Sequence, residues 1–182
     1  MPEYSLDYET RSRADLRKVG AFRYAYDPST ELLCFSLLKE NGEPRIWVPK
    51  KWRYIVEGHM PLVPDHELDE LSNPETIVSA FNAGFEIAIT DSLFESTTGY
   101  PAIPHKQWRC VAAMARRAAL PASLEKVAET LKLTNLKDSK GKGLIRKFSS
   151  PQTVGKLKGK FIEPTDDPEA FREFCQYCLQ DS

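Results

Sequence analysis

The sequence predicts an α/β domain with a mixed central sheet flanked by helices. Three short segments that favour strands come first, at 4–8, 31–38 and 45–48, and the turn signal Asn41-Gly42 joins the last two. Strand and helix patterns then alternate along the chain, as in α/β domains. A chain of 182 residues with 41% hydrophobic content can bury one core, so residues 1–182 are expected to form a single domain.

The middle of the chain continues this alternation. Residues 11–27 are expected to connect the first two strands, with room for a short helix before the break at Asp27-Pro28. A short helix is expected over 65–71. A strand over 77–81 should run directly into a helix over about 85–94.

The remaining elements are mostly helical. Residues 108–120 read as a short strand or turn that leads into an Ala-rich helix. Ser123 should cap a further helix, whose apolar stripe consists of Leu124, Val127, Ala128 and Leu131. The Lys-, Gly- and Ser-rich stretch 134–164 is expected to be a long functional loop. Asp167 and Pro168 supply an N-cap and a first-turn proline for a last helix that reaches Asp181.

Composition excludes several classes of protein. No apolar run approaches the roughly 20 residues needed to cross a bilayer, and the N-terminus has no signal-peptide pattern. Four scattered cysteines do not make a disulfide framework. We therefore expect a cytoplasmic protein without a membrane partner.

The net charge of −1 hides a local excess of positive charge. Between 137 and 160 the basic residues are Lys137, Lys140, Lys142, Arg146, Lys147, Lys156, Lys158 and Lys160, opposed only by Asp138. A charge run alone usually marks a solvated surface. If a pocket of acidic residues that binds metal ions lies nearby, however, a basic segment can hold a polyanion in place for that pocket to act on.

Three acidic motifs suggest such a pocket. Asp7 and Glu9 form D-x-E on the first strand, and alternation along a strand points both to one face. Glu86 ends N-x-x-F-E at a strand-to-helix turn. On the last helix, Tyr177 and Asp181 form Y-x-x-x-D and share a face.

Each motif taken alone has an ordinary explanation. D-x-E occurs on exposed strands, Glu86 fits a first helical turn, and Tyr177 could simply pack in the core. Together, four carboxylates in one pocket would repel each other unless cations lay between them. Oxygen ligands favour hard ions, so two divalent cations, Mg²⁺ or Mn²⁺, are expected. Cys175 and Cys178 match C-x-x-C, but no second pair accompanies them, and we interpret them as helical core.

In this order the motifs resemble the DEDD superfamily of 3′→5′ exonucleases, tyrosine subclass, whose fold is RNase H-like. The segments LDYETRSRADLRKVGAFRY, WRCVAAMARRAALPASLEKVAETLKL and KDSKGKGLIRKFSSP are similar to the proofreading domain of phage-type family A DNA polymerases. That domain continues into a polymerase domain, so the chain is expected to be an excised domain or a stand-alone exonuclease. A version extended beyond Ser182 is expected to be more active.

The resemblance implies a function for each motif residue. Asp7, Glu9, Glu86 and Asp181 would bind the two cations, and Tyr177 would position the attacking water. Thr10 and Asn82 fall where the family contacts the terminal nucleotide or braces the site. The family's second motif usually ends in Asp, so the longer Glu86 puts the affinity of the second metal site in question.

The implied reaction releases nucleoside 5′-monophosphates from the 3′ end of DNA. The substrate would be single-stranded or frayed DNA, and a DNA polymerase domain or subunit would be the partner. Arg146 and Lys147 are the candidates for the DNA groove. Two alternatives are an RNA-trimming exonuclease of the same superfamily and a nucleic-acid-binding module that has lost catalysis, with Glu86 as the lesion. A third is a purely structural metal site in an interaction domain.

Overall fold

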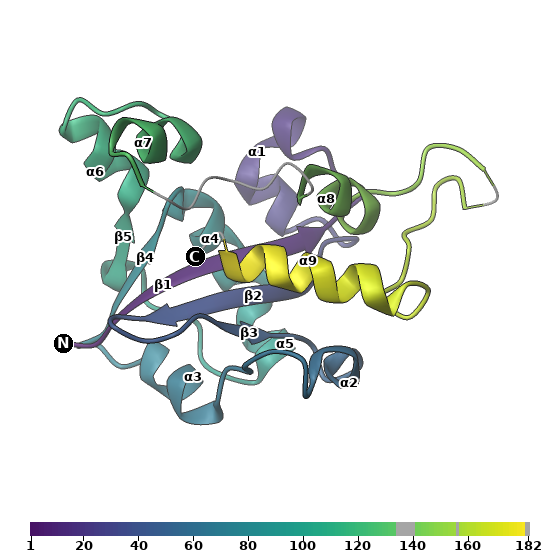
Figure 1. Ribbon diagram of the computed structural model, residues 1–182, viewed down its shortest axis with the longest axis horizontal. Coiled ribbons are helices and arrows are strands. Elements are labelled where there is room, and N and C mark those ends of the chain that lie inside the picture. Colours follow the sequence, from purple (N-terminus) through teal and green to yellow (C-terminus); the bar gives the residue numbers. More distant parts are fainter. Residues whose placement is uncertain (134–140, 156, 181–182) are drawn as a thin grey trace.

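The computed structural model describes residues 1–133, 141–155 and 157–180, and its centre is a mixed five-stranded sheet (Figure 1). Its strands are β1 (Glu3–Arg11), β2 (Glu31–Lys39), β3 (Arg45–Trp47), β4 (Ile77–Ala80) and β5 (Trp108–Cys110). Their order across the sheet is β3-β2-β1-β4-β5. The first three strands pair antiparallel, while β1–β4 and β4–β5 are parallel. The predicted α/β class with a mixed central sheet is confirmed.

Helices alternate with these strands along most of the chain. They are α1 (Leu16–Ala25), α2 (Arg53–Val56), α3 (Asp65–Leu71), α4 (Ala83–Ile89), α5 (Glu95–Thr98), α6 (Val111–Arg117), α7 (Leu124–Thr130), α8 (Gly141–Ser149) and α9 (Pro168–Gln180). A π-helical turn, η1 (Thr90–Phe94), joins α4 to α5, and a 3₁₀ turn, η2 (His105–Gln107), precedes β5. No helix within the described residues has the length and apolar character required to span a bilayer.

Two hydrophobic cores lie on opposite faces of the sheet. The first contains the β1 side chains Tyr4, Leu6 and Tyr8 together with residues of α3, α4 and η1. The second is formed by β2, β3, α2, α8 and α9, and includes Phe148, Phe171 and Phe174 of the last two helices. In Figure 1, α9 crosses in front of β1 and β2, whereas α4 lies behind the sheet. The large apolar side chains of β1 thus face the first core, and its polar side chains face the side that α9 covers.

The N-terminus of α9 forms as its sequence predicts. Asp167 Oδ1 accepts a hydrogen bond of 3.1 Å from the backbone N–H of Ala170, which satisfies one of the free donors of the first turn. Pro168 occupies the first helical position. Ser123 likewise caps α7, although Leu131 lies beyond its last residue and is exposed.

The prediction of a continuous loop over 134–164 is wrong at 141–149, whereas residues 150–155 and 157–164 form no helix or strand. Residues Gly141–Ser149 form α8 in spite of two glycines. Its Leu144, Ile145 and Phe148 pack into the second core, and the ring centroid of Phe148 lies 5.5 Å from those of Phe171 and Phe174. Tertiary burial of this apolar stripe therefore overrides the weak local propensity. Residues 134–140 of the expected loop lie outside the described residues.

Candidate active site

Asp7 and Glu9 lie on β1 and point to the same side of the sheet. Both are half-buried, whereas the alternating Leu6 and Tyr8 are buried on the other side. This alternation confirms the predicted geometry of the D-x-E motif. The register between β1 and β2 shifts at Glu9 and Thr10, a β-bulge of the kind that re-aims a side chain at the end of a strand.

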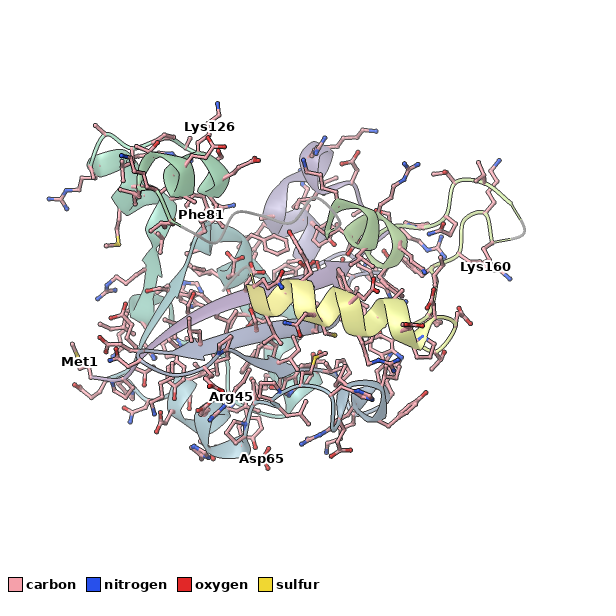
Figure 2. All side chains as sticks on the ribbon, in the orientation of Figure 1. Met1, Arg45, Asp65, Phe81, Lys126 and Lys160 are labelled. Atoms are coloured by element: carbon pink, nitrogen blue, oxygen red, sulfur yellow. The ribbon has the colours of Figure 1, made fainter. Side chains whose placement is uncertain are left out.

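Glu86 lies on α4, the helix that begins directly after the parallel neighbour of β1. It is only 5% exposed, and its Oε2 atom has no hydrogen-bond partner. Burial, together with the negative charge of Asp7, raises the pKa of Glu86 to about 8. The carboxylates of Glu86 and Asp7 are therefore electrostatic neighbours, although they come from different elements. Figure 2 labels Phe81, where β4 passes into the turn before α4.

Helix α9 covers the side of β1 that carries the two acids. The thiol of Cys178 donates to the backbone carbonyl of Asp7 at 3.7 Å. Burial raises the pKa of Cys178 to about 11, and the charges of Asp7 and Glu9 contribute to this rise. Cys175 and Cys178 are fully buried in the second core, which confirms their interpretation as helical core. The helix is thus anchored next to the acids.

Tyr177 precedes Cys178 and is buried, with 5% of its surface exposed. Its neighbour in α9 contacts β1, so the Y-x-x-x-D motif starts beside the strand that carries D-x-E. Asp181 lies outside the described residues. Its position one turn after Tyr177, on the same side of the helix, stays a prediction.

Gly141, the first residue of α8, lies against the ring of Tyr177. A Cβ atom built on Gly141 would come within 2.1 Å of Cε2 and 2.7 Å of Cζ of that ring. No side chain can occupy this position unless the ring moves. Sequence reasoning missed this contact because it placed Gly141 in a loop. The available signal was the apolar Leu144, Ile145 and Phe148 that follow the glycine at helical spacing.

The donor chemistry of these residues fits hard divalent cations. Within residues 1–133, 141–155 and 157–180, no three Asp, Glu, His or Cys side chains lie close enough together to hold one ion. The buried Oε2 of Glu86 nevertheless lacks a hydrogen-bond partner, and the charge of Asp7 makes its ionisation costly. A cation between these carboxylates would bind the unpaired Oε2 of Glu86 and offset the repulsion between Glu86 and Asp7. Asp7 and Glu86 are the two described carboxylates that could share it, and Glu9 and Asp181 stay predicted ligands.

Thr10 and Asn82 occupy different environments near these acids. Thr10 is buried, and its hydroxyl and that of Tyr24 from α1 are hydrogen-bonded at 2.9 Å. Thr10 therefore braces α1 against the end of β1. Asn82 is exposed at the N-terminus of α4, and its side chain makes no capping hydrogen bond. Contacts of either residue with a nucleotide stay predictions.

Arg146 and Lys147 both lie on α8. Arg146 is exposed, whereas the ammonium of Lys147 forms an ion pair with Asp167 just before α9. Lys147 thus fastens α8 to α9 and lowers the pKa of the Asp167 carboxyl. Lys137, Lys140 and Lys156 of the basic run lie outside the described residues. A role of Arg146 and Lys147 in a DNA groove stays a prediction.

Arg11 holds the end of β1 in place, a role that sequence reasoning did not assign. Its guanidinium bonds Glu31 through two nitrogens, at 2.9 and 2.6 Å, and Glu163 at 3.0 Å. It also lies over the rings of Trp52 and Phe161, at 5.4 and 4.9 Å from their centroids. These contacts fix the strand end two residues after Glu9.

Comparisons with known proteins link the chain to a phage polymerase. No protein-family model matches it. Over its whole length the chain is 36% identical to a segment of the DNA polymerase of Bacillus phage SP02. It spans about a quarter of that relative, 26% of its length.

Proposed function

We propose that this chain is a metal-dependent 3′→5′ exonuclease that removes nucleoside 5′-monophosphates from DNA 3′ ends and proofreads for a phage DNA polymerase. The observation that carries the proposal is the buried Glu86 carboxylate, which lacks a hydrogen-bond partner and faces the charge of Asp7. A fold maintains such a costly arrangement where function needs it. The coupling of Glu86 to Asp7 and the contact of α9 with β1 support the proposal that the three motifs act together.

The similarity to a phage DNA polymerase supports DNA as the substrate. The matching segment covers the whole chain, and the chain carries the acidic motifs in the order typical of an RNase H-like proofreading domain. We propose that fold and that role for this chain, with the polymerase as a linked domain or separate subunit. The basic residues of α8 lie next to α9 and support binding of a polyanion.

The mechanism assigns separate tasks to the residues. Asp7, Glu9, Glu86 and Asp181 would hold two divalent cations, Mg²⁺ or Mn²⁺, which supply a water of lowered pKa and neutralise the departing 3′ oxygen. Tyr177 would orient the attacking water through its hydroxyl, with its ring held by Gly141. The hydrogen bond between Thr10 and Tyr24 would hold the end of β1 and α1 in a fixed position relative to the scissile phosphate. Positioning and electrostatics would then supply most of the catalysis.

Digestion of a 5′-labelled DNA strand tests this function directly. With Mn²⁺ or Mg²⁺, the wild-type protein is expected to give a ladder that shortens from the 3′ end, and Asp7→Ala is expected to abolish it. A matched control is Asp69→Ala, which removes an exposed carboxylate of α3. Equal shortening by wild type and Asp7→Ala would contradict the proposal.

The same assay separates the alternatives. An RNA-trimming enzyme would shorten an RNA oligonucleotide faster than DNA of the same sequence. A binding module without catalysis would bind the 3′-OH strand but leave its length unchanged with either metal. DNA hydrolysis that is faster than RNA hydrolysis is the outcome that the similarity to a DNA polymerase favours.

A further inference from the structure

Helix α1 has one buried side that belongs to the candidate active site. Tyr24 and Ala25 are buried, and Tyr24 bonds Thr10 and lies 6.0 Å, ring to ring, from Phe85. Phe85 immediately precedes Glu86 on α4. The charge of Glu9 also contributes to raising the pKa of Tyr24, after burial. The inner side of α1 therefore lies against the residues that carry the chemistry.

The outer side of the same helix exposes two aromatic rings. Phe22 is 64% exposed and Tyr26 is 55% exposed, and their rings stack with centroids 5.3 Å apart and planes 22° apart. Their four-residue separation puts them on one helix face. Gly20, with φ 78° and ψ 166°, breaks the helical geometry just before them and so sets the orientation of this last turn. The pair therefore presents two aromatic faces to solvent on which a flat apolar group can stack.

The segment that carries the ring pair is rich in positive charge. Its exposed basic side chains are Arg13, Arg17, Lys18 and Arg23, of which Arg13 donates to the carbonyl of Gly159 at 2.7 Å. Asp15 is the one carboxylate between 13 and 26, and it lies 3.6 Å from Lys18 while capping the helix. The guanidinium groups of Arg17 and Arg23 make no hydrogen bond or ion pair with the described part of the chain. The surface thus offers rings for stacking and free guanidinium groups together.

We propose that Phe22 and Tyr26, with Arg17 and Arg23, form a platform that binds the single-stranded DNA leading into the active site. Proteins that hold single strands combine a positive surface with aromatic rings on which bases stack. The excess of cations in residues 13–27, four against two carboxylates, favours a polyanion over a protein surface. In Figure 1, α1 lies near the C-terminal end of β1, and its Tyr24 contacts Thr10 and Phe85, the neighbours of Glu9 and Glu86, so a strand bound on this helix lies close to the acids. This inference rests on the proposed function, and it assigns to this surface the binding of the nucleotides that precede the 3′ end.

Fluorescence anisotropy of a labelled oligo(dT) in EDTA measures this binding without hydrolysis. The double variant Phe22→Ala/Tyr26→Ala is expected to raise the Kd at least tenfold, as loss of base stacking does. The matched control is Tyr54→Ala on α2, an equally exposed ring at 64%, which should leave the Kd within twofold. Circular dichroism melting confirms that each variant is folded, which the exposure of these rings leads us to expect.

Two further measurements separate this inference from the proposed function. The double variant should hydrolyse the p-nitrophenyl ester of thymidine 5′-monophosphate, which has no upstream bases, at the wild-type rate. Arg17→Gln/Arg23→Gln should reduce the salt dependence of oligo(dT) binding by about 0.7 in log–log slope for each phosphate that the two arginines neutralise. An unchanged Kd in the folded double variant overturns the platform even if the ester is cleaved, and would then assign the face to a protein partner. Failure of wild type to cleave the ester overturns the proposed function alone.

Discussion

Two buried glutamates at different places in the fold have opposite environments. Glu67 of α3 and Glu86 of α4 are each only 5% exposed. Glu67 forms an ion pair with Arg45, and its neighbour Glu70 bonds both Lys39 and Tyr4. Glu86 instead has an oxygen without a hydrogen-bond partner and faces Asp7. A buried acid with a cationic partner is part of the framework, whereas one that faces another acid marks a site for chemistry.

Removing the charge of Glu86 is expected to have the largest effect, and that effect is on catalysis. Glu86→Gln keeps the size of the side chain but removes its charge, so it should weaken the hold on a cation that supplies several kcal/mol to the transition state. We expect the rate of DNA shortening to fall by about a thousandfold. Because the substitution also removes repulsion from Asp7, the melting temperature without metal should stay constant or rise. A variant with wild-type activity would exclude Glu86 from the metal site.

A smaller loss of activity should follow from moving Tyr177. Gly141→Ala places a methyl group where the ring now lies, and a shift of about 1 Å can cost up to about a hundredfold in rate. Gly143→Ala is the matched control, because a Cβ there meets nothing within 4 Å. The ratio of the two rates, measured on the same 5′-labelled strand, checks the prediction. Equal rates would show that the ring can move without consequence.

The pH dependence of stability tests the raised pKa of Glu86. Glu86 has a pKa raised to about 8 in the folded chain, above the ordinary 4.5. The folded state therefore keeps a proton that the unfolded state has lost, so stability should fall as pH rises from about 4.5 to 8. In EDTA, the melting temperature of Glu86→Gln relative to wild type should increase across this range. Mg²⁺ or Mn²⁺ should reduce that difference, because a cation stabilises the ionised carboxylate.

Substitution of Glu67, the buried glutamate with a cationic partner, should lower stability and leave activity unchanged, opposite to substitution of Glu86. Glu67→Gln leaves Arg45 without its ionic partner and is expected to lower the free energy of unfolding by about 1–2 kcal/mol. The guanidinium of Arg45 is partly exposed, which limits the loss. Exonuclease activity should stay within twofold of wild type. Denaturant unfolding of the two Gln variants side by side, together with the rate assay, completes the comparison, and an inactive Glu67→Gln would undermine it.

The strand carrying the D-x-E motif illustrates what local patterns can predict. Alternation of large apolar and acidic residues from Tyr4 to Glu9 is enough to fix a central strand with both acids on one face. The cap and proline before α9 fix where that helix begins. The convergence of these elements came from the resemblance to exonucleases rather than from periodicity, and the charge coupling of Glu86 to Asp7 now supports it.

Other features depended on contacts between distant segments. Helix α8 has two glycines in its first three residues, which weaken its helix propensity, and burial of Phe148 against α9 stabilises it as a helix. The ion pair between Lys147 and Asp167 uses a side chain that sequence reasoning reserved for DNA. The contact of Gly141 with Tyr177 joins residues 36 positions apart, and no short pattern encodes it.

By itself, the sequence determined the fold class, the face of β1 that carries Asp7 and Glu9, and the start of α9, because these follow from side-chain alternation and helix capping within a few residues. Tertiary structure decided that α8 is a helix, that Gly141 lies against Tyr177, and that the outer side of α1 exposes a stacked ring pair. The physical reason is that burial and charge interactions at these places join elements far apart in the chain, and neither periodicity nor capping reports which of them meet.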